Sequence, residues 1–437
     1  MTLATPTETA SENTRAENVR TDKVKVLPFD WPEEGVTRIP FQIFSDPAVY
    51  KLEQERIFRG PVWHFLCLEL DLKEPGDYRT SFIGDTPIIA VKDRDGEINA
   101  MVNRCAHKGA LVCHKERGNA KALSCVYHSW TYDLSGQLMG LAFRDGLRGK
   151  GGMPDDFSVK DHRLQPVRSA VFAGMVFGTF SDETPDVESF FGAEMCKILR
   201  RNFSRPLKLL GYHSQIIHNN WKLYAENVRD SYHATLLHTF YTTFKINRLD
   251  MDGGIRITDA AQPWHHLSFA KRATLDAAEE YKAAEVHSAS YETRLNGPEL
   301  LEAWNEFDDG ITHSIQALFP TLAIQFTLNS LAVRWFTPRG VDKTELFWMY
   351  IGYEDDDEAE ERMRIMQSNL TGAAGLVSLE DGCINEFVQR GTKGSGQSAS
   401  AFMEMGGKTV ESSEASRATE VAIRGFWKGY REIMGFA

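Results

Sequence analysis

Two carboxylates and two imidazoles lie close together between residues 219 and 241, where the sequence reads NNWKLYAENVRDSYHATLLHTFY. They are Glu226, Asp230, His233 and His238. Imidazole is a good ligand for iron, copper, zinc and nickel, so two His of fixed spacing and a remote carboxylate could hold such a metal with open coordination positions. Taken alone, the segment could also be an amphipathic helix whose polar face contains two His.

The spacing of the two His carries a geometric prediction. Residues of an α-helix follow one another at about 100°. His233 and His238, five positions apart, would therefore lie roughly 140° from each other on a regular helix. Both can face one metal only if the helix breaks or widens between them, as it does at π-bulges. Asp230 precedes His233 by three residues and could hydrogen-bond its ring.

A second group alternates cysteine and histidine: Cys105-x-His107 and, after seventeen residues, Cys125-x-x-His128. This order fits a two-iron, two-sulfide Rieske cluster, with Cys105 and Cys125 on one iron and His107 and His128 on the other. Two imidazoles in place of thiolates raise the reduction potential, so the cluster could accept electrons from a low-potential ferredoxin. A structural zinc site is the alternative, although zinc motifs usually place two Cys before two His.

Short strands must position these two loops. Strand-like runs cover 62–70, 77–84, 86–93 and 97–103, and a run at 170–180 closes the region. Asp95-Gly96 is a strong hairpin signal. The cluster loops therefore interrupt an all-β region. Within this region we expect Trp130 and Tyr127 to shield the cluster from solvent. Cys113 and His114 are expected to be neighbours of the cluster and not ligands.

Helical patterns flank this region and dominate the second half of the chain. A helix is predicted within 41–60, with Asp46 as its N-cap, and another over 187–201. The polar stretch 249–290 suggests a loop-rich lid or partner contact. Further predicted elements are strands at 322–328, 331–338 and 345–353, a helix capped by Ser378, and a helix over 414–434.

Composition narrows the class of protein. A chain of 437 residues is long enough for two or three domains. Its net charge of −12 argues against nucleic-acid binding. No apolar run is long enough to span a membrane, and the Thr- and Glu-rich N-terminus predicts a disordered leader and a cytoplasmic protein. Its six Cys are too scattered for a disulfide framework.

The two groups together resemble the catalytic α subunit of Rieske non-haem iron aromatic-ring-hydroxylating oxygenases. The resemblance rests on Cys-x-His…Cys-x-x-His followed by NWK and Glu226-x3-Asp230-x2-His233-x4-His238, and it spans the chain after residue 37. Within that family the sequence is most similar to the branch acting on anthranilate, salicylate and terephthalate. The segments with this closer likeness are GDTPIIAVKD, RGNAKALSCVYHSW, GGMP, NSLAVRWFTP, SLEDGCINEFVQRGT and EMGG.

The resemblance implies a mononuclear Fe(II) held by His233, His238 and a distant Asp, with open positions for O₂. Asp381, in SLEDG, matches that Asp. Ser378-x-x-Asp381 can also be interpreted as a capping box, and Glu380 is the alternative ligand.

The resemblance also assigns roles around these ligands. Asp230 matches a carboxylate that links a Rieske His of one subunit to an iron His of the next, here His128 and His233, which would make the monomer catalytically incomplete. Glu226 and Asn227 are expected to line or support the site, unless they are ordinary polar helix residues.

Substrate anchoring is predicted from one strand. In LAVRWFTP, alternation places Arg334 on one face with Ala332 and Phe336. A buried Arg is costly unless it is paired, and a substrate carboxylate could pair it bidentately. A protein salt bridge or an exposed sheet face is the alternative. Arg390, in VQRGT, is a second candidate.

We therefore predict an α+β protein: a leader and N-terminal arm at 1–37, a β Rieske domain at 38–165, and a helix-grip catalytic domain at 166–437, with an antiparallel sheet around a long helix. The hypothesis is hydroxylation of an aromatic carboxylate with O₂, using a [2Fe–2S] cluster and mononuclear Fe(II). The family implies a ferredoxin or flavin reductase as electron donor and a small β subunit in an α3β3 assembly. The alternatives are a Rieske monooxygenase or demethylase, a pure electron carrier, and a zinc-stabilised ligand-binding module.

Overall fold

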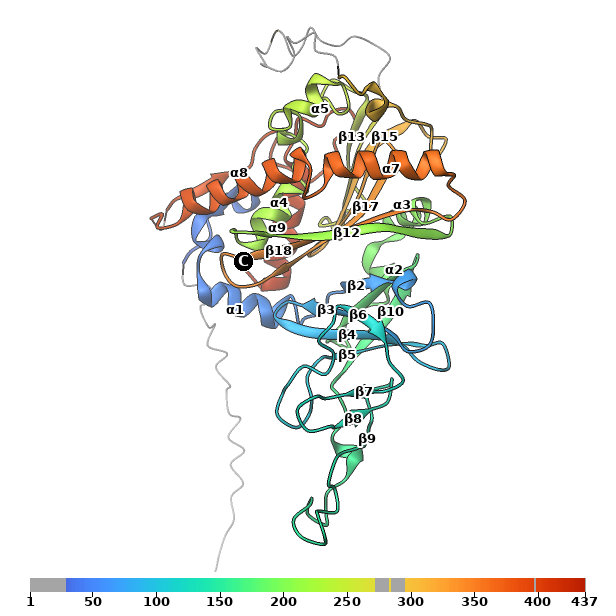
Figure 1. Cartoon of the computed structure of the whole chain (residues 1–437). Helices are drawn as coiled ribbons and strands as arrows, with labels where there is room; N and C mark the ends of the chain where they lie inside the picture. The colour runs from blue at the N-terminus through green and yellow to red at the C-terminus, as the bar shows by residue number, and fades with distance from the viewer. Residues whose placement is uncertain (1–28, 272–282, 284–294, 397, 437) are drawn as a thin grey trace, which may run out of the picture.

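Two seven-stranded antiparallel sheets form the body of the protein, as the computed structural model shows (Figure 1). The structure describes residues 29–271, 283, 295–396 and 398–436. Most of the predicted leader lies outside these residues. The α+β class is confirmed, with the strands gathered into sheets and helices packed against the second sheet.

The first sheet carries the Cys/His loops and has the strand order β2-β11-β10-β5-β4-β3-β6. The predicted turn at Gly96, with φ +88°, joins β4 to β5. A small sheet, β7-β8-β9, extends beyond it. The strands are β2 (His64–Leu68), β3 (Asp77–Ile83), β4 (Thr86–Lys92), β5 (Ile98–Val102), β6 (Arg117–Asn119), β7 (Leu123–Ser124), β8 (Thr131–Tyr132), β9 (Leu138–Gly140), β10 (Pro166–Phe172) and β11 (Met175–Thr179).

Strand pairing extends the first sheet beyond residue 165. The strand expected over 170–180 is a hairpin of β10 and β11 that turns at Ala173 and Gly174, both at positive φ. This hairpin lies beyond residue 165 yet supplies two strands of the first sheet. A hairpin between the edge and the centre of a sheet cannot be separated from it without breaking the hydrogen-bond ladder, so the first sheet continues to residue 179.

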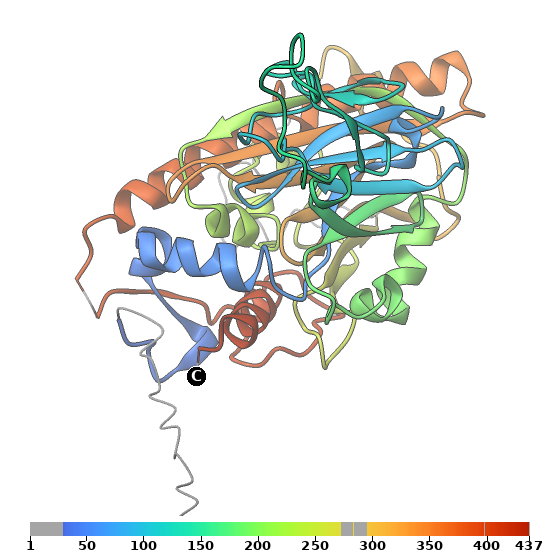
Figure 2. The same cartoon turned by 90° about the horizontal axis from the view of Figure 1, so that it is seen from below.

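The N-terminal residues belong to the second half of the molecule. Strand β1 (Arg38–Pro40) pairs with β19 (Ser400–Phe402). Asp46 caps helix α1 (Pro47–Arg56), as predicted, through hydrogen bonds from the backbone of the first turn. On α1, the buried Glu53 accepts hydrogen bonds from the side chains of Trp221, Lys222 and Tyr430. Figure 2 shows α1 lying beside the C-terminal helix.

The second sheet has the order β12-β18-β17-β16-β15-β14-β13. Its strands are β12 (Leu207–Ile217), β13 (Gly253–Ile257), β14 (His266–Lys271), β15 (Ile311–Leu318), β16 (Leu322–Thr327), β17 (Ser330–Pro338) and β18 (Thr344–Tyr353). The expectation of a loop-rich lid over 249–290 is wrong for its first part, because β13 and β14 pair there with each other and with β15. The remainder of that stretch lies almost entirely outside the described residues.

Helices complete the second half. They are α2 (Val187–Phe191), α3 (Ala193–Asn202), α4 (Trp221–Asn227), α5 (Thr239–Thr243), α7 (Glu358–Thr371), α8 (Leu376–Thr392) and α9 (Val421–Met434). Helix α7 packs on β17 and β18, and α8 follows it along the same side of the molecule (Figure 1). Ser378 does not cap α8, which begins two residues earlier; its hydroxyl donates to the side chain of Gln215.

Candidate metal centres

The His-bearing segment breaks directly after α4. The helix ends at Asn227, and His233 opens a short 3-10 helix, η5 (His233–Thr235), while His238 precedes α5 as its N-cap residue. One oxygen of Asp230 accepts hydrogen bonds from the backbone N–H of Tyr232 at 2.9 Å and of His233 at 3.1 Å. A carboxylate in this position favours a new turn over continuation of the helix. The predicted break is confirmed, although it begins before His233.

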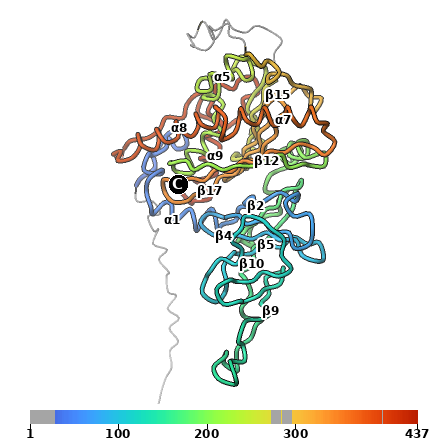
Figure 3. The backbone as a smooth tube through the Cα atoms, viewed as in Figure 1, coloured from blue at the N-terminus to red at the C-terminus, as the bar shows by residue number. Residues whose placement is uncertain are grey.

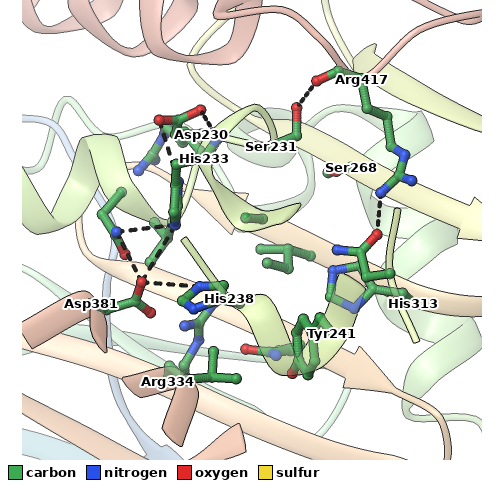
Figure 4. A pocket seen from close by; sticks show the side chains of 18 residues that line it. Asp230, Ser231, His233, His238, Tyr241, Ser268, His313, Arg334, Asp381 and Arg417 are labelled. Atoms are coloured by element: carbon green, nitrogen blue, oxygen red, sulfur yellow. Dashed lines mark hydrogen bonds and ion pairs between the residues drawn. The ribbon is translucent and has the colours of Figure 1, made fainter. Parts of the chain in front are cut away.

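The break lets His233, His238 and Asp381 converge. One ligand atom from each lies within 4.8 Å of the others. Asp381 Oδ1 lies 3.4 Å from His233 Nε2 and 3.2 Å from His238 Nε2 (Figure 4). Asp381 comes from α8, whose first two turns pass the broken segment. Two His and one carboxylate that face a single metal position leave room for further ligands. This is the ligand set of non-haem Fe(II) oxygenases.

Each imidazole is oriented by a second carboxylate on its other nitrogen. His233 Nδ1 lies 3.3 Å from Asp230 Oδ2, and His238 Nδ1 lies 2.7 Å from Glu380 Oε2. Both Nε2 atoms therefore point toward Asp381. Such partners fix the ring orientation of metal-binding His and raise its basicity. Glu380, the alternative ligand in the sequence prediction, is placed by the structure behind His238.

Burial and neighbouring charges have opposite effects on the pKa values of these three residues. Burial would raise the pKa of Asp381, but His238 and His233 hold that pKa far below its usual range. Burial lowers the pKa of His233, yet hydrogen bonds and charge from Asp230 and Asp381 raise it to about 10. The pKa of His238 is also raised, against burial, by Asp381 and Glu380. The carboxylates thus favour positive charge at this point, and a divalent cation can supply it with release of protons.

Asn227 and Glu226 face different surroundings. The Asn227 amide donates to Asp381 Oδ1 at 3.1 Å and lies 3.4 Å from His233 Nε2, so it touches two of the three converging residues. Glu226 instead accepts from Trp427 Nε1 at 2.5 Å, and burial, against that hydrogen bond, raises its pKa to about 8. Glu226 lines a larger hollow of about 510 Å³, which His233 also lines.

The cavity on the inner side of the three residues is small, about 40 Å³, and it is rich in guanidinium groups. Arg334 lies on β17 and is 3% exposed. Its Nη1 donates to the Tyr224 hydroxyl at 3.3 Å, and its guanidinium lies 4.8 Å from the Trp348 ring centre. Within the described part of the chain, Nε and Nη2 have no hydrogen-bond partner and no carboxylate pairs with the group. The predicted protein salt bridge and exposed face are both wrong.

The same cavity contains residues that the sequence did not reveal. Arg417 lies across it from Asp381 (Figure 4), and Arg229 lines it beside Asp230. Arg417 donates to the side chain of Asn247 and the backbone oxygen of Arg248. It sits in an irregular segment before α9, where no periodicity or motif marks it. Only an alignment of relatives or the fold itself could have found it.

Arg390, predicted as a second carboxylate anchor, does not line this cavity. It lies on the exposed side of α8 and lines another hollow, together with Asp342 and Lys343. Arg390 is nine residues from Asp381 on the same helix, or two and a half turns, so its side chain starts on a different face.

The two Cys/His loops share one backbone geometry. In the first, Cys105 N–H donates to Ala110 O at 2.8 Å and Gly109 N–H donates to Cys105 O at 3.0 Å. In the second, Cys125 N–H donates to Trp130 O at 2.9 Å and Ser129 N–H donates to Cys125 O at 2.9 Å. Gly109 and Ser129 occupy the same place and both have positive φ, +75° and +55°. The loops thus present their Cys and His as a matched pair.

The loops fit a two-iron cluster better than a single zinc ion. The His107 and His128 rings lie 4.6 Å apart at the exposed end, and both Cys are buried and unbridged. Four ligands of one zinc must all converge. Among the residues that the structure describes, only His233, His238 and Asp381 converge in that manner. Cys113 and His114 stay predicted as neighbours and not ligands, and the Cys113 backbone forms two hydrogen bonds with the Asn103 side chain.

Aromatic residues surround the loops unequally. Trp130 is buried and stacks on His107 with ring centres 5.0 Å apart. Tyr127 covers His128 but is itself 59% exposed, so it shields the ring only on one side. The Tyr132 hydroxyl accepts from Ala106 N–H and lies 3.3 Å from Cys105 Sγ, to which it would donate once that sulfur is a deprotonated cluster ligand. Hydrogen bonds to cluster sulfurs raise the reduction potential.

The two centres lie at opposite ends of the molecule (Figure 3). The small sheet β7-β8-β9 stands below the first sheet in Figure 3, whereas α5 lies at the far end of the second sheet. The intervening distance is filled by the packed core, in which Phe65 of the first sheet contacts Trp335 of the second at 5.2 Å between ring centres. No helix of the described residues is long and apolar enough to cross a membrane.

Comparisons with known proteins agree with this geometry. Residues 204–435 match the model of the ring hydroxylating alpha subunit catalytic domain, and residues 62–148 match the Rieske [2Fe–2S] domain. The chain is 45% identical to the α2 subunit of the terminal oxygenase component of terephthalate 1,2-dioxygenase from a Comamonas species, over 93% of this chain and 97% of that one. It is 41% identical to the anthranilate 1,2-dioxygenase large subunit of Burkholderia cepacia, over 93% and 95%.

A third relative is the large oxygenase component of salicylate 5-hydroxylase from a Ralstonia species, 36% identical over 94% of this chain and 98% of that one. Among solved structures, naphthalene 1,2-dioxygenase from a Rhodococcus species superposes with a TM-score of 0.75 at 24% identity, covering 91% of this chain and 94% of that one. That likeness concerns the fold.

Proposed function

Because the chain belongs to the family of Rieske ring-hydroxylating oxygenase α subunits, we propose that it hydroxylates an aromatic carboxylate. It is an oxidoreductase whose cofactors are a Rieske [2Fe–2S] cluster and a mononuclear iron. When bound, the cluster passes single electrons and the mononuclear iron supplies the position at which O₂ is reduced. In our proposal Cys105, His107, Cys125 and His128 hold the first, and His233, His238 and Asp381 hold the second.

Asp230 is proposed as the junction between the two centres of neighbouring chains. Its Oδ2 orients His233, and its side chain keeps about a fifth of its surface exposed beside the 510 Å³ hollow. Because the cluster loops of the same chain lie at the opposite end, His128 of a second copy would reach this carboxylate. This requires a ring of chains, and we propose the α3β3 assembly with a small β subunit. Electrons would come from a ferredoxin or flavin reductase.

Arg334 carries the proposal of an acidic substrate. A buried guanidinium with two unsatisfied nitrogens is costly, and a carboxylate would satisfy both in a bidentate pair. A neutral aromatic hydrocarbon would leave that cost in place. The cavity must widen on binding, because benzene occupies a void of roughly 150 Å³ and the present one is about 40 Å³.

Arg417 favours an acid with a second anionic group. It lines the same cavity as Arg334 from the other side, so an aromatic ring with carboxylates at both ends could contact the two guanidiniums. Among the three substrate types, terephthalate has that shape. Salicylate and anthranilate place their second polar group beside the first.

The test is a product assay of the reconstituted oxygenase with β subunit and reductase, across terephthalate, anthranilate, salicylate and halobenzoates. We expect turnover of an acid, with terephthalate preferred, and the products also separate dioxygenation from monooxygenation. Arg334→Met should raise KM for the acid by about 30- to 100-fold, as expected for losing a charged hydrogen-bonded pair. The exposed Arg390→Met is the matched control and should leave KM unchanged.

Arg417→Met tests the second anionic contact. It should lower kcat/KM for terephthalate far more than for anthranilate. An equal loss for both acids would assign Arg417 a structural role only, and an Arg334→Met enzyme with unchanged KM would overturn the acid-binding proposal.

A further inference from the structure

One face of the second sheet forms the floor of the 40 Å³ cavity shown in Figure 4. The floor includes Ser268 of β14, Ile315 of β15, Gln325 of β16 and Arg334 of β17. Ile315 is the register partner of both Ser268 and Gln325, so these three side chains share one face. Gln325 pairs with Ala332, two residues before Arg334, which makes Gln325 and Arg334 diagonal neighbours. Such neighbours lie about 7 to 8 Å apart, within reach of a single ligand.

The Gln325 amide has one atom bound and one atom open. The side chain is 4% exposed, and its Nε2 donates to Thr327 Oγ1 at 3.0 Å. Its Oε1 is buried and has no hydrogen-bond partner among the residues that the structure describes. Arg334 and the Tyr241 hydroxyl also have open atoms in this cavity, but a guanidinium can only donate. Gln325 Oε1 is therefore an open acceptor beside an open donor.

The surroundings favour this orientation of the amide. Burial and the charges of Arg417 and Arg334 lower the pKa of His313 to about 3, so its ring is neutral and one nitrogen can accept. His313 Nδ1 lies 3.0 Å from Thr327 Oγ1, which can donate to it while accepting from Gln325 Nε2. The reverse orientation would turn the partly positive amide NH₂ toward the two guanidinium groups of the cavity, which would repel it.

The open acceptor and the open guanidinium require one ligand between them. Nε and Nη2 of Arg334 have no partner among the described residues, so they do not bind Gln325 Oε1. A carboxylate would satisfy Arg334, and a donor on the next ring atom of the ligand would then lie beside Gln325. An amino group there has two hydrogens, one for the ligand's own carboxylate and one for Gln325. A hydroxyl has a single hydrogen, which that carboxylate accepts.

We propose that Gln325 selects aromatic acids with an amino group beside the carboxylate; this rests on the proposed function. A site with a buried polar group that bonds a substrate N–H disfavours the analogue without it, because the protein group is then left unpaired. The selection does not depend on a second anionic group. It applies to anthranilate and equally to a terephthalate that carries an amino group, so the role proposed for Arg417 is unchanged.

The experiment measures binding by calorimetry to the assembled oxygenase, loaded with both cofactors and with the cluster oxidised, so that no turnover occurs. The ligands are anthranilate and 2-methylbenzoate, whose methyl group is close in size to the amino group and cannot donate. The wild-type enzyme should bind anthranilate about five- to tenfold more tightly. Salicylate should bind like 2-methylbenzoate, and 2-aminoterephthalate should bind more tightly than terephthalate.

Two variants assign the preference to a residue. Gln325→Met removes the amide oxygen and keeps an unbranched side chain of similar length, so the preference for anthranilate should disappear while 2-methylbenzoate still binds. Tyr241→Phe is the matched control, because it removes the other open hydroxyl of the cavity and should keep the wild-type preference. Cluster absorbance and iron content should match the wild type in both variants.

Four outcomes would overturn the proposal. Equal binding of the two acids by the wild-type enzyme does so without any variant. A preference that survives in Gln325→Met, or one that is lost in Tyr241→Phe, places the contact elsewhere. An equal loss of affinity for both acids in Gln325→Met would make Gln325 a partner of Arg334 only. In all four cases acids still bind and the proposed function stands, whereas binding of no acid would overturn both.

Discussion

The two metal centres of this chain are built in opposite ways. Each cluster loop closes through its own backbone, with hydrogen bonds between residues four and five apart, and it places its His at the surface. The mononuclear site depends on side chains from distant parts of the chain, such as Asn227 and Asp381, which are 154 residues apart. One centre is a local structure repeated twice; the other exists only when α4, η5 and α8 are assembled.

This difference has an energetic consequence. A backbone-closed loop can lose one ligand and keep its shape, because its hydrogen bonds do not involve the ligand side chains. At the mononuclear site the side chains are one another's partners, so removing one leaves buried polar groups unsatisfied. The structural effect of a substitution should therefore extend to several residues at the mononuclear site, and it should stay within one loop at the cluster.

Asp381→Ala should have the largest effect. It removes a proposed ligand and leaves His233 and His238 without the carboxylate between them. We expect loss of the mononuclear iron and a fall in hydroxylation of at least ~100-fold, since even outer partners of metal ligands account for up to that factor. Iron analysis with the spectrum of the reduced cluster measures both. Full mononuclear iron in this variant would assign the ligand role elsewhere.

Asp230→Asn should interrupt electron transfer between the two centres and leave both centres intact. Asparagine keeps an oxygen for the backbone N–H groups of Tyr232 and His233, so the turn should survive. The charge at the junction is lost, and hydroxylation should fall by about 100-fold while the cluster still forms and is reduced. Wild-type activity in Asp230→Asn would contradict the junction between subunits.

Glu380 offers a graded test of the same network. Glu380→Ala removes the partner of His238 Nδ1 and should weaken iron binding by roughly 10- to 100-fold. Glu380→Gln keeps an acceptor and should lose less. Iron titration of both variants, with cluster content as the internal reference, distinguishes an orienting residue from a ligand.

Glu226 should impose a pH dependence on stability. Its pKa is raised from 4.5 to about 8 by burial, so the folded state favours the protonated form. The stabilising contribution is present below pH 4.5 and is lost as the pH rises toward 8. We expect a loss on the order of 5 kcal/mol across that range, largely absent in Glu226→Gln. Urea unfolding at both ends of the range measures it, and parallel curves would contradict the prediction.

The smallest effects are expected in the cluster loops, where one position differs in residue type. Gly109 and Ser129 both have positive φ, so Gly109→Ala should destabilise its loop and Ser129→Gly should relieve strain, each by about 1 kcal/mol. The rate of cluster loss on warming reports both. Equal and opposite changes in the rate of cluster loss would confirm that the two loops are equivalent. A large effect of either substitution on the mononuclear iron content would contradict the view that effects stay within the cluster loops.

Prediction from sequence succeeded where the signal was local. The hairpin turn at Gly96, the Asp46 cap and the break near His233 all follow from neighbouring residues, and all are present. It failed where partners come from afar. The local pattern does not show that β1 pairs with β19 or that the β10–β11 hairpin joins the first sheet, because only strand pairing and the Glu53 contacts show what these residues pack against.

The sequence by itself determined the chemistry of both centres, because few residue types bind iron and their spacing along the chain limits which can meet. Only the tertiary structure decided between Glu380 and Asp381, which are adjacent in sequence and face opposite nitrogens of His238. It also decided that Arg334 is buried with no carboxylate of the described residues beside it, and that Arg390 is at the surface. Burial and the direction of a side chain depend on neighbours hundreds of residues away, and no local pattern records them.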